Sequence, residues 1–416
     1  MAAALRRTQI RLRVPRPSSF STTADAAAPA TFPVPEPDPI SRAKSAIRSE
    51  SDPERIASLF LSSVHSPKFY GDRAIYKLSI SKLARSHRHD LIERLLEPHL
   101  AGSSSTSDAN PNPKSEGFHI RIITLYSEAG MIDHAVRAFR RIPDSGLRYT
   151  ERSLCAILTA FRKNRKHDLL LRTFQSAPED LQISPGITSH NIVLNALCTH
   201  GDVAGARKML DEMEGKGTKP DLVSYNTLLT GYLKKGEESG FDDVLKEMVA
   251  KGLAPSVVTY NCRIGDLCSK KRTSEAEELL DAMASKGVRP NRGTFNAIID
   301  GFCKEDDVVA AMRVFKRMPR AKKEDGHGGA SPNFDTYVLL IRSLVEKGEF
   351  LSGLEVFKEC LDRKWAPPFE AVKGLVEGLK NEAQFNDAEY VVVKMRKAVK
   401  GDAVDAWKKV EGALSV

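Results

Sequence analysis

The sequence of 416 residues lacks any long apolar run and contains few aromatic side chains. None of its apolar stretches approaches the roughly 18–20 residues that a membrane-spanning helix needs, so we expect no membrane span. Aromatic residues make up 7% of the chain, against 41% hydrophobic and 28% charged residues. This balance is typical of a helix-rich protein. A chain of this length forms either two or three compact domains or one extended repeat array.

Cysteine is scarce, and its spacing indicates neither a disulfide framework nor a metal site. The six cysteines form no C-x-x-C pair, and none has a histidine at ligand spacing. Cys198, Cys268 and Cys303 each stand twelfth in a repeat described below. We therefore expect small buried thiols in a reducing compartment, and no bound metal or cofactor.

Motifs of catalysis are also missing. There is no GxxxxGK[ST] loop, no G-x-S-x-G elbow and no aspartate cluster that resembles a metallonuclease. The chain after Met395 lacks the H-x-E and C-x-x-C elements of a nucleotide deaminase. His87 and His89 lie in a basic turn, where solvation is favoured over metal binding. The sequence therefore predicts no enzyme and no small-molecule substrate.

Acidic residues are absent from the first 24 positions, which carry five arginines. Subtracting these five from the formal charge of +9 leaves +4 for the rest, which permits a nucleic-acid partner without indicating one. Residues 1–24 have the composition of a mitochondrial transit peptide, with a plastid peptide or a disordered basic tail as alternatives. Residues 25–39 are proline-rich and predict an extended linker.

A 35-residue repeat dominates the rest of the chain. Three copies align without gaps from Ile187, Leu222 and Val257, and a fourth from Arg292 carries about seven extra residues at 323–329. Weaker copies begin at Glu116, Glu151, Phe334 and Phe369, with a poorer one near Arg73. Residues 40–64 are expected to form a degenerate helix pair. We predict degenerate helical repeats and a Ser/Asn/Pro-rich loop over 40–115, the main array over 116–403 with its best repeats at 187–333, and a tail over 404–416.

Each copy contains two amphipathic stretches of about a dozen residues, which predict a helix pair. The pair closes on Gly217, Gly252 or Gly287, where a helix C-terminus favours glycine. A small residue and a large apolar residue recur five and twelve positions after the central turn; they are Ala135, Ala206, Ala276, Ala311 and Ala388, and Ile142, Met213, Met248, Met283, Met318 and Met395. One pair cannot bury these faces alone, so we predict an all-α solenoid, a superhelix of stacked helix-turn-helix repeats.

The segments VSYNTLLTGYLKKG, VVTYNCRIGDLCSK and GTFNAIIDGFCKED, with the closing turns KGTKP, KGLAP and KGVRP, resemble the pentatricopeptide repeat family. The resemblance covers roughly residues 73–403, in repeats of the pure 35-residue type. It implies a right-handed superhelix that binds single-stranded RNA in an organelle without catalysis. Short members of this type include proteins associated with the plant mitochondrial ribosome.

In this family one base docks per repeat, and the fifth and last residues of the repeat read its edge. Carried over, these pairs are Asn191 with Asp221, Asn226 with Ser256, Asn261 with Asn291, and Asn296 with Asn333. They imply uracil, cytosine and two further pyrimidines. The second residues Val223 and Val258 would pack on base faces, whereas Thr188, Gly293 and Asp335 depart from the pattern. Lysines near the end of the first helix could meet phosphates: Lys163, Lys234, Lys270 and Lys304.

The alternative to base reading is that these asparagines form only local hydrogen bonds, because a polar residue early in a helix often bonds to the backbone or to water. The flanking repeats hold non-reading residues at the same positions: Ile120 with Thr150, Cys155 with Gly186, and Val338 with Pro368. Four loosely read pyrimidines cannot define one site, so specificity would come partly from a partner or from structured RNA. Two hypotheses follow: an adaptor for a mitochondrial transcript or ribosomal RNA in RNA metabolism or translation, and a protein–protein scaffold.

Overall fold

The chain folds into a single stack of helix pairs. The computed structural model describes residues 38–66, 68–100, 115–319, 330–399 and 402–414, and these residues contain 21 α-helices and no strand. The predicted leader, most of the predicted linker, the loop at 101–114 and the extra residues 323–329 lie outside the described residues. The prediction of an all-α solenoid is confirmed.

Ten consecutive helix pairs and one final helix make up the stack. The first helices of the pairs are α1 (Pro39–Ser49), α3 (Arg73–Arg85), α5 (Glu116–Glu128), α7 (Glu151–Lys163), α9 (Ile187–His200), α11 (Leu222–Lys235), α13 (Val257–Ser269), α15 (Arg292–Lys304), α17 (Phe334–Glu346) and α19 (Phe369–Asn381). The second helices are α2 (Pro53–Ser63), α4 (His89–Leu100), α6 (Ile132–Arg140), α8 (His167–Asp180), α10 (Val203–Gly215), α12 (Glu238–Ala250), α14 (Thr273–Ser285), α16 (Val308–Arg317), α18 (Phe350–Asp362) and α20 (Phe385–Ala398), and α21 (Asp402–Leu414) follows. Every first helix from α3 onward begins at the residue that the repeat predicted.

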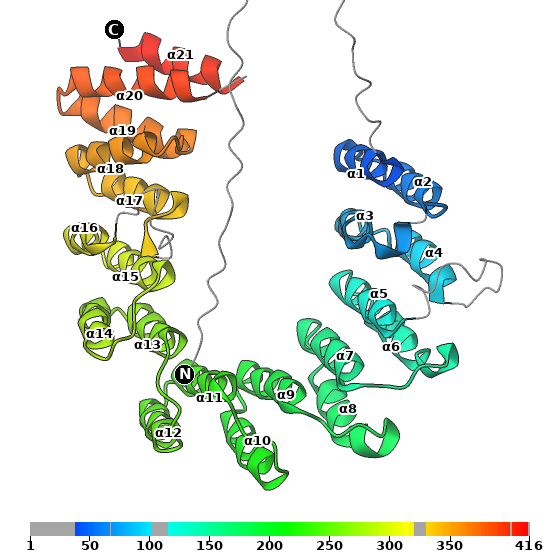
Figure 1. Cartoon of the computed structure of the whole chain (residues 1–416). Coiled ribbons are helices and arrows are strands. Elements are labelled where there is room, and N and C mark those ends of the chain that lie inside the picture. Colours follow the sequence, from blue (N-terminus) through cyan, green and yellow to red (C-terminus); the bar gives the residue numbers. More distant parts are fainter. Residues whose placement is uncertain (1–37, 67, 101–114, 320–329, 400–401, 415–416) are drawn as a thin grey trace, which may run out of the picture.

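The pairs follow one another around an open arch (Figure 1). The first helices α5 to α15 lie on its inner side and the second helices α6 to α16 on its outer side. Neighbouring first helices pack directly on one another, as α5 does on α7 and α13 on α15. The inner surface is therefore a continuous row of first helices, with the same repeat position recurring on each.

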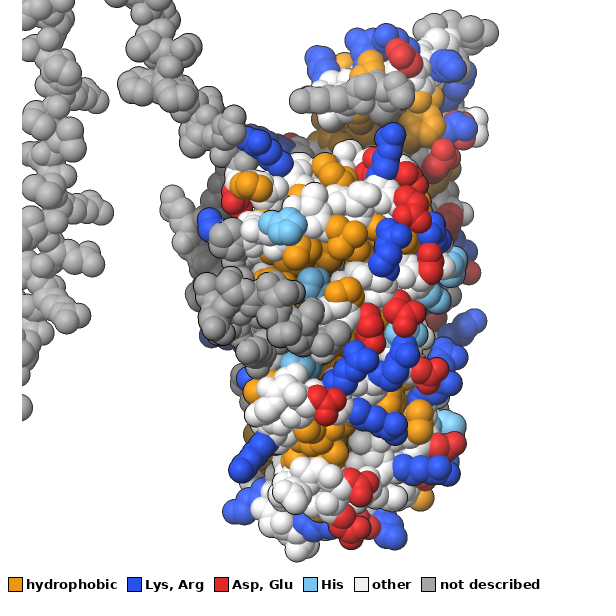
Figure 2. Space-filling view, turned by 90° about the vertical axis from the view of Figure 1, so that its right-hand side faces the viewer, with side chains coloured by type: hydrophobic (Ala, Val, Ile, Leu, Met, Phe, Trp, Pro, Cys, Tyr) orange, Lys and Arg blue, Asp and Glu red, His pale blue; other side chains and the backbone are white. Residues whose placement is uncertain are grey.

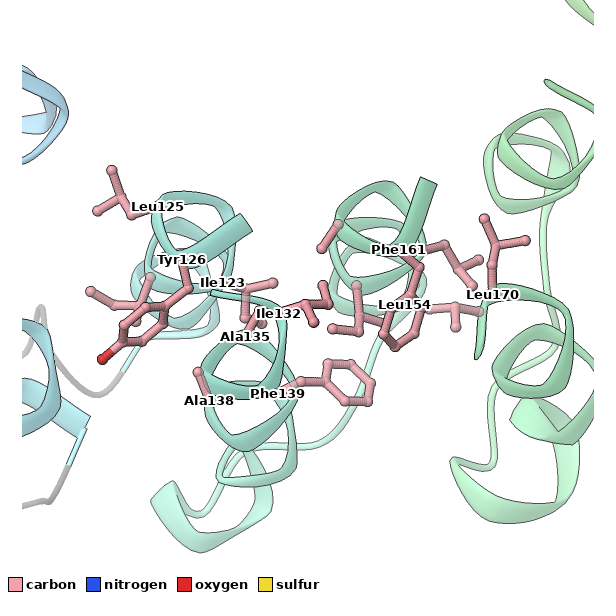
Figure 3. Packing of buried hydrophobic residues seen from close by; sticks show 14 of the residues in the cluster. Ile123, Leu125, Tyr126, Ile132, Ala135, Ala138, Phe139, Leu154, Phe161 and Leu170 are labelled. Atoms are coloured by element: carbon pink, nitrogen blue, oxygen red, sulfur yellow. The ribbon is translucent and has the colours of Figure 1, made fainter. Parts of the chain in front are cut away.

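Small and large side chains alternate in the core as the repeat requires. All five predicted alanines are fully buried, and the predicted large apolar residues are at most 2% exposed. Alanine lets the helices of a pair approach closely, whereas methionine fills the irregular gap against the next pair. Figure 3 shows the packing around α5 to α8, where Ile132, Phe139, Leu154 and Phe161 meet between the helices. Gly217, Gly252 and Gly287 have φ between 72° and 79°, the left-handed conformation that their position predicted.

The apolar core is interrupted beside α13. One buried cluster ends at Met248 of α12, and the next begins at Ile264 of α13. At this junction Glu238 accepts hydrogen bonds from Arg263 at 2.9 Å and from Lys270 at 3.1 Å. Charged contacts thus replace part of the hydrophobic packing in the middle of the array.

The predicted tail contains a helix that the repeat pattern did not predict. The side chain of Trp407 in α21 is fully buried, and its ring meets Phe369 edge-on with 4.9 Å between centroids. Arg396 of α20 pairs with Glu411 at 2.6 Å. α21 therefore covers the apolar end of the last helix pair.

Candidate nucleic-acid interface

The predicted base-reading residues meet in pairs at the junctions between first helices. The four asparagines stand in the second turn of α9, α11, α13 and α15, and their predicted partners are the N-cap residues of the next first helix. The Asn191 Nδ2 atom donates to Asp221 Oδ1 at 3.2 Å, and Asn296 Nδ2 lies 3.5 Å from Asn333 Oδ1. In these two repeats the structure thus brings the fifth and last residues within hydrogen-bonding distance, which is a prerequisite for reading one base jointly.

The last residues also have a structural task. Asp221 Oδ1 accepts from the backbone N–H groups of Val223 at 3.0 Å and Ser224 at 2.9 Å. Such N-caps stabilise a helix by about 0.5–2 kcal/mol. Burial raises the pKa of the Asp221 carboxyl, but the Ser224 N–H and the Asn191 amide outweigh it and hold that pKa below its ordinary value. The position therefore serves the fold whether or not it meets RNA.

A third set of residues at these junctions was missed from the sequence. The third residue of each following repeat is a serine or threonine, at most 3% exposed, whose hydroxyl donates to the asparagine oxygen Oδ1 of the preceding repeat. The alternative of purely local bonding does not describe these asparagines, because the hydroxyl partners lie 33 or 40 residues further along the chain. The pairs and O···O distances are Ser224–Asn191 at 2.6 Å, Thr259–Asn226 at 2.7 Å, Thr294–Asn261 at 2.7 Å and Thr336–Asn296 at 2.8 Å.

A groove of about 400 Å³ opens across α9, α11 and α13. Its lining includes Asn226, its predicted partner Ser256, the predicted base-packing residues Val223 and Val258, and Lys234. Val223 and Val258 are 56% and 57% exposed. One groove therefore offers polar atoms for a base edge, two apolar faces for a ring and an ammonium group for a phosphate.

The four predicted lysines differ in their electrostatic surroundings. Among the described residues Lys234 has no carboxylate within ion-pairing distance, whereas Lys304 pairs with Asp300 at 2.6 Å and Lys163 lies 3.8 Å from Glu128. Lys270 lies 3.0 Å from Asp266 and 3.1 Å from Glu238, and hydrogen bonds to these two carboxylates raise its pKa. Lys234 is thus the best placed of the four to attract a phosphate.

The flanking repeats present a different inner surface. A second groove, of about 350 Å³ between α5 and α7, is lined by Ile120, Thr124, Cys155 and Ala156, with Lys163 at its edge. No amide group stands at the fifth position there, where Ile120 and Cys155 take its place. The polar reading positions are confined to the repeats that begin at 187, 222, 257 and 292.

The outer face of the N-terminal limb carries charges of both signs. Figure 2 shows acidic and basic side chains interspersed over this face. Arg137 pairs with Glu93 at 3.2 Å, and Arg141 with Glu97 at 2.9 Å. These two arginines therefore have their charge balanced locally by carboxylates.

Neither metal chemistry nor membrane insertion is indicated by the described residues. They contain no group of three or more metal-ligating side chains, and none of their helices is long and apolar enough to span a bilayer. All six cysteines are free thiols; Cys198 and Cys360 are buried and the other four are half-buried. Burial raises the pKa of the Cys198 thiol to about 11, which leaves it unreactive near neutral pH.

Comparison with known proteins identifies the repeat. The pattern of the PPR repeat family matches residues 185–234, 220–269, 255–304 and 290–346, and a single PPR repeat matches 335–364. Residues 185–364 therefore consist of pentatricopeptide repeats (PPRs). This assignment agrees with the prediction of a repeat array that binds RNA without catalysis.

Several relatives from Arabidopsis thaliana share this repeat. The small ribosomal subunit proteins mS79 and mS78 are each 31% identical over 173 residues, which cover 42% of this chain and 42% of each relative. This PPR protein thus matches less than half of the length of those relatives. A PPR-containing protein described as mitochondrial is 28% identical over 384 residues, 91% of this chain and 86% of the relative.

Solved PPR structures are similar at lower identity. The crystal structure of PPR10 from maize matches with a TM-score of 0.44 and 18% identity, over 89% of this chain and 60% of that one. PPR10 in complex with an 18-nucleotide psaJ RNA element matches with a TM-score of 0.43 and 19% identity, over 86% and 60%.

Proposed function

We propose that this PPR protein binds single-stranded, pyrimidine-rich RNA along the inner side of its four central repeats. The observation that carries the proposal is the groove across α9, α11 and α13, where Asn226, Ser256, Val223, Val258 and Lys234 line one space. A base ring placed between the two valines would direct its polar edge at the asparagine and leave its phosphate toward the lysine.

The proposed order of bases follows from the residue pairs, read from the 5′ to the 3′ end. Asn191 with Asp221 would take uracil and Asn226 with Ser256 would take cytosine. The pairs Asn261 with Asn291 and Asn296 with Asn333 would each take a pyrimidine. Four such contacts give limited sequence information, so a partner or the shape of the RNA would supply the remaining specificity.

We further propose that the protein acts in mitochondria, in RNA metabolism or translation, as a factor associated with the mitochondrial ribosome. Two observations support this. The first 24 residues carry five arginines and no acid, and the relatives include small ribosomal subunit proteins and a protein described as mitochondrial. The RNA would then be a mitochondrial transcript or ribosomal RNA.

Ultraviolet crosslinking of the tagged protein in isolated mitochondria, with sequencing of the bound RNA, tests this proposal. Sedimentation of the same lysate through a sucrose gradient gives the assembly in which the protein travels. We expect pyrimidine-rich crosslinks and co-sedimentation with a ribosomal subunit. Crosslinks with no base preference would contradict base reading, and sedimentation as a free protein would contradict the ribosomal association.

A protein–protein scaffold is the second candidate, and the flanking repeats favour it. Ile120 and Cys155 line an inner groove where a reading repeat would present an amide. In a scaffold the partner would remain bound after the RNA is digested. Affinity purification with and without ribonuclease treatment separates the two functions, because an RNA-bridged partner is lost on digestion.

A further inference from the structure

The third-position hydroxyl finds a different acceptor wherever the preceding repeat has no asparagine. Ser153 follows the repeat of Ile120, and its hydroxyl donates to the backbone carbonyl of Thr150 at 2.8 Å. Ser189 follows the repeat of Cys155, and its hydroxyl lies 2.9 Å from the backbone carbonyl of Gly186. The hydroxyl therefore does not need an asparagine to be satisfied. Where an asparagine is present, the hydroxyl lies within 2.8 Å of its Oδ1 atom in all four cases. At Ser224, Thr294 and Thr336 the N-cap oxygen of the same repeat is a second acceptor, at 3.0, 3.1 and 2.7 Å.

The hydrogen bonds around Thr259 fix the direction of its hydroxyl proton. The Oγ1 atom accepts from the backbone N–H of Ser256 at 3.0 Å, as part of a capping box. A hydroxyl has a single proton to donate, and the Asn226 oxygen Oδ1 lies 2.7 Å away, nearer than the Ser256 hydroxyl at 3.3 Å. The Asn226 amide is consequently held with its oxygen toward Thr259. Its NH₂ group has no hydrogen-bond partner among the described residues.

We propose that the third-position hydroxyl of each following repeat, Ser224, Thr259, Thr294 or Thr336, sets which atom the reading asparagine presents to RNA. The asparagine oxygen is engaged by the hydroxyl, so the Nδ2 group supplies the donor for the base. At Asn191 and Asn296 one of the two Nδ2 protons is directed at Asp221 or Asn333, and the other is left for the base. This inference rests on the proposed function, and it names specificity-determining residues outside the fifth and last positions.

The chemistry of the bases makes this orientation consequential. A free amide could rotate and offer either a donor or an acceptor, and would then tolerate several base edges. An amide held as a donor requires an acceptor on the base, and both pyrimidines offer the O2 carbonyl oxygen there. The edge of guanine that carries N1–H and N2–H presents donors, which would oppose the Nδ2 protons. The hydroxyl thus favours a pyrimidine over guanine.

A simpler role for Thr259 is to join adjacent repeats by a hydrogen bond. In that case its removal would lower stability and overall affinity, while the ratio between RNAs would stay constant. If the hydroxyl orients the amide, the ratio itself changes. Base discrimination at one position is therefore the readout that separates the two roles.

The test uses the full chain with Thr259→Val, which keeps the side-chain shape and removes the hydroxyl, and Thr259→Ser, which restores it. Ser153→Ala is the matched control, because it removes a capping-box hydroxyl that has no asparagine to orient. Two further variants, Asn226→Ala and the combination of Asn226→Ala with Thr259→Val, complete a double-mutant cycle. Binding is measured by filter retention with two 12-mers that differ only at the base opposite this repeat, cytosine or guanine. Melting temperature checks that each variant folds, and Thr294→Val, acting on Asn261, replaces Thr259→Val if that variant unfolds.

We expect wild type, Thr259→Ser and Ser153→Ala to prefer cytosine by roughly tenfold. Thr259→Val should lose most of that preference. The double variant should have the same preference as Asn226→Ala alone, because Thr259 acts through Asn226. A folded Thr259→Val variant with the wild-type preference overturns this inference alone. Wild type that binds both RNAs equally overturns the proposed function, and this inference with it.

Discussion

The sulfur of Cys198 lies against Gly231 of the next repeat. A Cβ atom added to Gly231 would stand 2.6 Å from Cys198 Sγ and 3.1 Å from its Cβ. Cys268 has the same relationship to Gly301, at 2.9 Å. Cys198 and Cys268 are thus packing residues, which explains why their spacing follows the repeat. Close approach of neighbouring first helices also brings each asparagine within reach of the next hydroxyl.

Gly231→Ala is predicted to destabilise the central repeats. Alanine favours a helix by up to about 1 kcal/mol over glycine, but overpacking costs about 1–3 kcal/mol and should outweigh it here. Gly265→Ala is the control, since no atom lies within 4 Å of the added Cβ, and it should be neutral or stabilising. Hydrogen exchange should place the damage in α9 to α13, because a solenoid couples mainly to its neighbours. Uniform loosening from α3 to α20 would contradict the packing described here.

Replacing Val223 and Val258 with alanine should weaken RNA binding without loss of stability. Both side chains are more than half exposed, so the fold gains little from them, whereas a stacked base would lose apolar contact. The control is Val249→Ala on α12, because Val249 is 52% exposed and lies on an outer helix. Affinity by filter binding and melting temperature are measured together. Equal loss of affinity in the Val249 variant would exclude a specific role for the two inner valines.

Lys234→Ala should reduce the salt dependence of RNA binding more than Lys270→Ala does. Each phosphate contact contributes about 0.7 to the slope of log K against log salt for a single strand. Lys234 has no carboxylate partner among the described residues, whereas Asp266 and Glu238 already balance the charge of Lys270. Affinity is measured at several salt concentrations, and equal slopes for both variants would contradict this ranking.

The first 40 residues should direct import without the rest of the chain. Their arginines and the absence of an acid before Asp25 are typical of a transit peptide. A fusion of residues 1–40 to a fluorescent protein should enter mitochondria, and replacement of the five arginines by glutamine should leave it in the cytosol. Diffuse signal from the unaltered fusion would exclude an import signal, and plastid signal would correct the organelle.

The fold could be predicted largely because its determinants recur at one period. Ile187, Leu222 and Val257 start helices where the 35-residue alignment placed them, and the buried alanines and methionines occupy the predicted positions. α21 could not be predicted in this way, because it is a single helix without a copy elsewhere. Its burial depends on Trp407 meeting Phe369, and no period in the sequence relates those two residues.

The candidate site could be predicted only in part. The asparagines stand out because an amide recurs at one repeat position. Thr259 does not stand out in the sequence, because the capping box at the start of α13 already accounts for a threonine three residues after Ser256. Its second role depends on Asn226, which lies 33 residues earlier and becomes a neighbour only when the repeats stack. The pairing of Lys270 with Glu238 could not be predicted either, because these two residues lie 32 positions apart and become neighbours only when the repeats stack.

The central claim is that Asn191, Asn226, Asn261 and Asn296 together give the protein its pyrimidine preference. The direct measurement is filter binding of wild type, and of the variant with all four changed to alanine, to pyrimidine and purine 12-mers at several salt concentrations. We predict that wild type prefers the pyrimidine RNA, and that the variant binds both weakly and equally with a remaining dependence on salt. Equal binding of both RNAs by wild type, unchanged in the variant, would contradict the claim and favour the scaffold.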